Sequence, residues 1–119
     1  MKTTYTATFS DGTTKTRKSE AEYTFAWRVR RENNTGSDIT LKDWKKVEAG
    51  RVCETFGFSK SRENAEKSAS SCWSRCTSNE DLNSRNQWVK SQVRKYSDDL
   101  PQFVKQLEAI TTIEVVPCD

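Results

Sequence analysis

The chain has 119 residues, of which 33% are hydrophobic and 31% are charged, with a formal net charge of +3 at pH 7. This length suits one core, so we expect residues 1–119 to form a single domain. Four tryptophans, three tyrosines and five phenylalanines exclude a disordered chain, because they supply large apolar groups for that core. No signal peptide or membrane-spanning run is visible, so we expect a cytoplasmic protein without a membrane partner.

The positive charge is uneven along the chain. Residues 1–60 carry 12 Lys and Arg against 8 Asp and Glu, whereas residues 61–119 carry 8 against 9. A basic first half is typical of a surface that attracts an anionic partner. The alternative is that these residues only keep a small domain soluble.

Residues 3–18 are predicted to form a β-hairpin. Apolar and polar residues alternate up to Phe9, and Asp11-Gly12 follows between two β-prone runs. Asp-Gly is typical of a two-residue type I′ turn, because that turn needs positive φ at both positions. The returning run, residues 13–18, has no large apolar side chain, so we expect it at the edge of a sheet.

Residues 23–31 contain the clearest strand pattern. Large apolar residues occupy the odd positions Tyr23, Phe25, Trp27 and Val29. Successive side chains of a strand point to opposite faces, so the pattern predicts a central strand with one buried face. The other face carries arginine.

The segment after the loop at residues 32–38 has two interpretations. Leu41, Trp44 and Val47 have helical spacing, which predicts a short helix over residues 41–48. A continuous strand through Gly50 is the competing interpretation.

The later elements complete the fold. Strands are predicted over residues 51–58 and 110–116. Helices are predicted from an N-cap at Ser59 or Ser61 to Cys76, from Ser84 to about residue 97, and from Pro101 to Leu107. The link at residues 77–83 is polar. The fold class predicted is α+β: a mainly antiparallel sheet of four to five strands with helices packed on one face, in the order β-β-β-(α)-β-α-α-α-β.

The side chains argue against an enzyme. The chain has no histidine, so it lacks Ser-His and Cys-His pairs and the commonest zinc ligand. It also lacks a Walker loop and a dinucleotide fingerprint. We therefore expect no catalytic residue and no cofactor.

Four cysteines, Cys53, Cys72, Cys76 and Cys118, allow either a zinc site or core packing. Cys72 and Cys76 lie one helical turn apart, but their spacing matches no standard zinc motif. Cysteine is a common buried apolar residue, so we expect core packing and no metal.

Basic residues suggest a binding surface. Lys15 and Arg17 share one face of a predicted strand, as do Arg28 and Arg30. Gathered on one exposed sheet face, they would track phosphates. The candidate binding residues are Lys15, Arg17, Arg28, Arg30, Arg31, Lys45 and Lys46.

The run VCETFGFSKSRENAEK at residues 52–67 loosely resembles AP2-type and integrase arm-binding domains, over residues 3–75 at most. Those domains pack a three-stranded sheet against a helix, with an aromatic residue ending the third strand and an alanine in the first helical turn. The resemblance implies a sheet that enters the DNA major groove. By type only, the small chain without catalytic residues also resembles phage inhibitors of host defence, including anti-CRISPR proteins.

Two functions follow from these patterns. The first is a small non-catalytic binding protein, a phage-type inhibitor of a host nucleic-acid-handling defence machine. It would be anti-CRISPR-like and act by binding a protein surface, with a host protein or nucleoprotein complex as its partner. The alternative is a nucleic-acid-binding domain that contacts DNA or RNA with the basic sheet face.

Overall fold

The computed structural model describes residues 2–42, 44–77 and 79–118. The strands are β1 (Thr3–Thr8), β2 (Thr14–Ser19), β3 (Phe25–Glu32), β4 (Ile39–Leu41), β5 (Lys45–Val47), β6 (Val52–Ser59) and β7 (Thr111–Pro117). The helices are α1 (Arg62–Cys76), α2 (Asn79–Leu82), α3 (Gln87–Lys95) and α4 (Leu100–Ile110). These elements confirm the α+β class.

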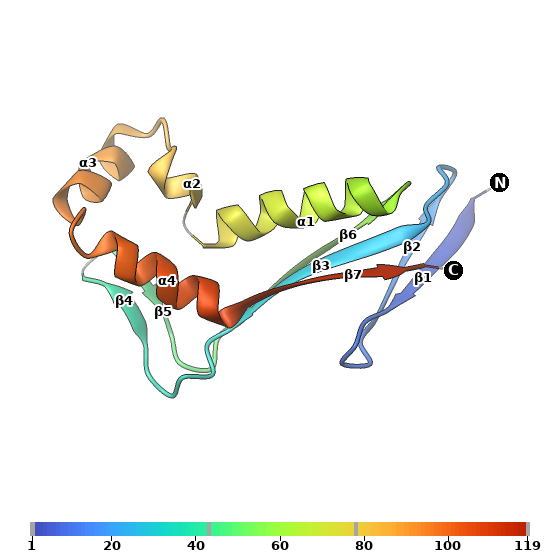
Figure 1. The fold of residues 1–119 in the computed structure, drawn as a ribbon, viewed down its shortest axis with the longest axis horizontal. Helices are drawn as coiled ribbons and strands as arrows, with labels where there is room; N and C mark the ends of the chain where they lie inside the picture. The colour runs from blue at the N-terminus through green and yellow to red at the C-terminus, as the bar shows by residue number, and fades with distance from the viewer. Residues whose placement is uncertain (1, 43, 78, 119) are drawn as a thin grey trace.

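Strand β3 is the centre of the main sheet, as its alternating pattern predicts. The strand order is β6-β3-β7, and β3 is antiparallel to both neighbours (Figure 1). The sheet has three strands instead of the expected four to five, because the β1–β2 and β4–β5 hairpins each form a separate two-stranded sheet.

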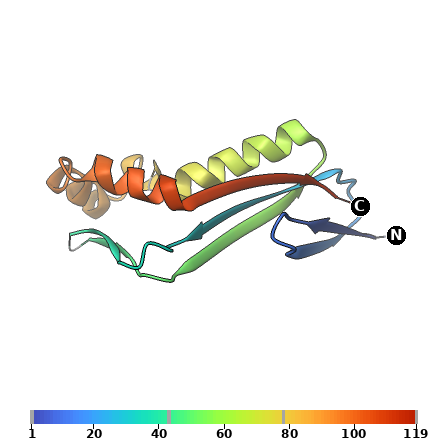
Figure 2. The ribbon, with the colours of Figure 1, turned by 60° about the horizontal axis from the view of Figure 1, so that its bottom comes forward.

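The two faces of β3 are covered by different elements (Figure 2). Helix α1 covers one face, where Val29 packs with Ala69 and Cys72. The β1–β2 hairpin covers part of the other face, where Ala26 packs with Phe9. The arginine-bearing face is therefore partly covered, because the hairpin folds back over the sheet instead of extending it.

Tyr23 also departs from its predicted place. It precedes β3 and packs edge-on against Tyr5 of the hairpin, with ring centroids 5.3 Å apart. It thus belongs to the hairpin side of the sheet and not to the face under α1.

Small residues let α1 lie close to the sheet. Ala65 and Ala69 have no exposed surface, and the Ser61 side chain caps the helix by accepting a hydrogen bond from the Asn64 amide. Gly57 of β6 leaves room for its cross-strand neighbour Trp27, since a Cβ there would lie 2.7 Å from the Trp27 indole. The predicted helix is confirmed over Arg62–Cys76, and of the two candidate N-caps it is Ser61 that caps it.

The β1–β2 hairpin is confirmed, but its turn differs from the predicted type I′. The Phe9 carbonyl accepts from the Gly12 amide, and the Phe9 amide donates to the Thr13 carbonyl. Gly12 has φ 85°, whereas Asp11 has no positive φ. The connection is therefore a three-residue loop that ends in a left-handed glycine.

Residues 41–48 do not form the predicted helix. The segment forms the β4–β5 hairpin, in which Ile39 lies opposite Val47. Lys42 has φ 47°, which lies in the left-handed region, and a right-handed helix cannot continue through such a residue. Asp43, inside the same predicted helix, lies outside the described residues.

A second apolar cluster lies at the far end of the molecule. Helix α4 packs on the β4–β5 hairpin, burying Leu41, Phe103 and Leu107. The predicted helices at residues 84–97 and 101–107 correspond to α3 and α4, and the polar link before them contains the four-residue α2.

The molecule is long and flat. Its principal extents are 52 × 33 × 20 Å, and its radius of gyration is 16.7 Å, against about 13.5 Å for a compact chain of this length. Helix α3 lies at the end opposite both termini (Figure 1). Within the described residues, no helix combines the length and apolar character that crossing a membrane requires.

Candidate nucleic-acid interface

Arg28 does not lie on an exposed basic face. Its side chain is 6% exposed and is surrounded by carboxylates from three elements. The guanidinium lies 3.0 Å from Asp11, 3.5 Å from Glu54 and 3.2 Å from Glu114, and it stacks over the Phe9 ring. The prediction that Arg28 contacts phosphate from an exposed surface is therefore wrong.

The other residues of the predicted basic face are also engaged within the chain. Lys15 pairs with Glu54 at 2.6 Å, Arg17 lies over the Tyr23 ring, and Arg30 pairs with Glu32 at 3.2 Å. Arg28 is buried, and the Lys15 side chain lies between its own strand and β6. The four side chains therefore do not form one exposed surface.

The remaining three candidates lie elsewhere. Arg31 is on the α1 face of the sheet, where it donates to the Cys76 carbonyl at 2.9 Å. Lys45 pairs with Asp81, and Lys46 pairs with Asp38 at 3.2 Å. Most of the charge of the predicted site is therefore neutralised by nearby carboxylates.

Helix α3 carries the basic surface that the charge pattern of the first half did not reveal. No acidic residue occurs between Leu82 and Ser97, whereas that segment contains four cations, Arg85, Lys90, Arg94 and Lys95. Counting charge over residues 61–119 hides this run, because Glu80, Asp81 and the Asp98-Asp99 pair flank it.

The local sequence explains why α3 forms. Asn86 is its N-cap, and its side-chain oxygen accepts from the Trp88 amide at 2.9 Å and the Val89 amide at 3.4 Å. Val93 and Tyr96 then attach the helix to the apolar cluster around Phe103.

The opposite face of α3 is open to solvent. Gln87, Lys90, Ser91 and Arg94 are spaced i, i+3, i+4 and i+7, so they share one side of the helix. All four are exposed, and no residue of α3 is fully buried. We name these four residues the α3 face.

The cations of this segment have no carboxylate partner within the described residues. Lys90, Arg94 and Arg85 take part in none of the ion pairs there, and Lys95 lies over the Tyr96 ring. Lys90 and Arg94 are therefore available to an external anion.

An exposed tryptophan lies beside the α3 face. Trp88 is 59% exposed, and its ring meets the edge of Trp44 with centroids 6.5 Å apart. An accessible aromatic next to unpaired cations is typical of nucleic-acid-binding surfaces.

The four cysteines lie in different surroundings and do not form one group. Cys72 is buried with Val29, the Cys72 and Cys76 sulfurs are 3.9 Å apart, and Cys118 packs in the cluster around Phe9. Within the described residues, no group of three or more Cys, Asp or Glu could hold a metal.

Two of the thiols have shifted pKa values. Burial alone would raise the pKa of Cys53, but hydrogen bonds and charge from Arg51 and Arg31 outweigh it and lower that pKa. Burial, reinforced by the neighbouring Cys72, raises the pKa of Cys76.

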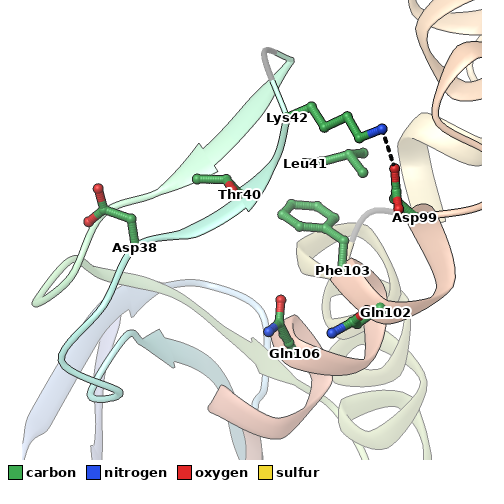
Figure 3. Close-up of a pocket in the computed structure, with 8 residues that line it drawn as sticks. All are labelled: Asp38, Thr40, Leu41, Lys42, Asp99, Gln102, Phe103 and Gln106. Atoms are coloured by element: carbon green, nitrogen blue, oxygen red, sulfur yellow. Dashed lines mark ion pairs between the residues drawn. The ribbon is translucent and has the colours of Figure 1, made fainter.

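A groove of about 320 Å³ lies between β4 and α4 (Figure 3). Phe103 forms its floor against Leu41, and the ion pair of Lys42 with Asp99, at 2.8 Å, closes one end. Hydrogen bonding by the Ala49 amide and Lys46 lowers the pKa of Asp38, so this carboxyl stays ionised. The lining provides polar groups for hydrogen bonds, among them Thr40, Gln102 and Gln106.

Comparisons with known proteins returned no relative. No family model, no curated protein and no solved structure matches this chain.

Proposed function

We propose that this protein binds nucleic acid and that it contacts duplex DNA through the α3 face. The observation that carries the proposal is an exposed helix face with unpaired cations, Lys90 and Arg94, beside two polar side chains, Gln87 and Ser91. An α-helix fits the DNA major groove, where cations contact phosphates and polar side chains contact base edges.

Position supports the same proposal. Helix α3 is at the tip of a flat molecule, away from the sheet and the β1–β2 hairpin (Figure 1). A protruding helix can enter a groove without a collision between the rest of the protein and the DNA backbone.

The experiment is fluorescence anisotropy of a labelled duplex at several salt concentrations. Lys90→Ala/Arg94→Ala should weaken binding roughly 10- to 30-fold and reduce the slope of log affinity against log salt by about 2, because two phosphate contacts are lost. Trp88→Ala should have a smaller effect on duplex binding.

The matched control is Lys46→Ala/Arg62→Ala. It removes the same charge from two exposed cations that already pair with Asp38 and Glu66, so affinity should change little. Equal losses in both double variants would show that only net charge matters and would contradict the α3 face. A preference for single strands that depends on Trp88 would assign the site to base stacking instead.

The inhibitor function stays a prediction. Absence of nucleic-acid binding at low salt would leave protein binding as the function to test.

A further inference from the structure

We infer that β6 is a dimerisation edge at which two copies of this chain join their sheets into one six-stranded sheet. The inference concerns a surface other than the α3 face and does not depend on nucleic-acid binding. Strand β6 is hydrogen-bonded to β3 on one side only.

The free edge of β6 lacks the features that normally prevent strand pairing. Edge strands of soluble proteins are usually short, bulged, or marked by Lys or Pro. Val52–Ser59 has eight residues in unbroken register with β3 and contains neither Lys nor Pro. Its one charge, Glu54, is already engaged by Lys15 and Arg28.

The edges of β2 and β7 are better protected. Strand β2 carries Lys15, Arg17 and Lys18. Strand β7 ends at Pro117, and the Trp73 indole donates to the Thr111 carbonyl at 3.1 Å. Strand β1 also lacks Lys and Pro, but it has six residues against eight in β6 and belongs to a separate two-stranded sheet.

The chain has enough exposed surface to form an interface with a second copy. The chain exposes 7637 Å², against about 6,600 Å² expected for a monomer of 13.7 kDa. The excess of roughly 1,000 Å² is comparable to the ~800 Å² that each partner buries in a standard interface. Val52 and Phe56, 47% and 41% exposed, lie on the same face of this edge.

The two copies pair in an antiparallel register with Thr55 on the two-fold axis. Here Glu54 lies opposite Phe56, and Val52 lies opposite Phe58, so no two like charges face each other and Val52 gains an apolar neighbour. A register centred on Glu54 would oppose two carboxylates, and one centred on Phe56 would place Val52 against Lys60.

Helix α1 leaves room for this arrangement. It lies mainly over β3 and β7, and Thr55 on its side of β6 is exposed.

The first test is the mass in solution by sedimentation over micromolar to near-millimolar concentrations. The wild-type chain should reach twice its monomer mass. Thr55→Lys alone and Thr55→Glu alone should each be monomers, because like charges meet at the axis, and an equimolar mixture should restore a 1:1 dimer. Restoration of the dimer also shows that both variants fold.

The second test is oxidation of Thr55→Cys in a Cys53→Ser background. Directly opposed residues of antiparallel strands have Cα atoms about 4.5–5.5 Å apart, which suits a disulfide. This variant should become a covalent dimer, whereas Ile113→Cys on β7 in the same background should not. A monomeric wild type at every concentration, a dimer unaffected by Thr55→Lys, or equal cross-linking of both cysteine variants would overturn the inference.

Discussion

Arg28 shows how burial decides what a charged side chain does. It shares its strand face with Arg30, but Arg28 is 6% exposed with three carboxylates around it, whereas the side chain of Arg30 is 31% exposed and pairs with Glu32. Removing one member of a buried ion pair lowers the free energy of unfolding strongly, because the opposite charges stay buried without a partner. Exposed ion pairs contribute little to that free energy.

We therefore predict different stabilities for two matched variants. Arg28→Ala should lower the free energy of unfolding by about 2–3 kcal/mol, less than for fully buried pairs because its three partners are partly exposed. Arg30→Ala should lower it by less than about 1 kcal/mol. Urea unfolding measures both, and equal effects would show that Arg28 does not hold the sheet and hairpin together.

At the scale of elements, polar contacts attach the β1–β2 hairpin to the sheet. The Asp11 carboxylate reaches Arg28, and the Ser10 amide donates to Glu114. Hydrogen bonds from Thr13, with a further contribution from Arg28, lower the pKa of Asp11 from 3.8 to about 2. A lowered pKa means that the ionised form stabilises the fold, fully above pH ~4 and progressively less as the pH falls toward 2.

This linkage predicts the pH dependence of Asp11→Asn. The variant should unfold at a lower urea concentration than wild type at pH 6, and the gap should shrink as the pH falls from about 4 to 2. NMR signals of the backbone amides in β1 and β2 should show the loss of the hairpin contacts over the same pH range. A gap that stays constant to pH 2 would contradict the assigned role of the carboxylate.

At the scale of the whole molecule, the core is divided. One cluster lies between α4 and β4–β5, a second under the β1–β2 hairpin and a third under α1. Separate clusters along a 52 Å axis allow one end to open while the other stays folded.

Phe103→Ala tests this division. The side chain is 2% exposed, and its removal should lower stability by about 3–5 kcal/mol. Hydrogen exchange should rise in β4, β5, α3 and α4 more than in β3 and β6. Phe9→Ala, the control from another cluster, should raise exchange in β1 and β2 instead, and a uniform rise in both variants would indicate one cooperative unit.

The sequence predicted elements with a long, regular pattern and missed those decided by distant contacts. Period-2 alternation identified β3, and helical spacing identified α1. Leu41, Trp44 and Val47 cover too few turns to distinguish a helix from the β4–β5 hairpin.

Distance along the chain also explains the misplaced site. The carboxylates that bury Arg28 come from Asp11, Glu54 and Glu114, and no local pattern connects them. In contrast, the sequence contains a signal for the α3 face, a run without acidic residues. It is found only when charge is counted over a window about as long as one helix.

The pairing of β3 with β7 has a consequence during protein synthesis. Arg28 and Glu114 are 86 positions apart, so a ribosome that adds about 5–20 residues per second makes the second neighbour of β3 roughly 4–17 s after the strand itself. Until then the nascent chain carries an unpaired edge on its central strand, and Arg28 lacks one of its three carboxylate partners. That interval is when a chaperone would be most useful to this chain.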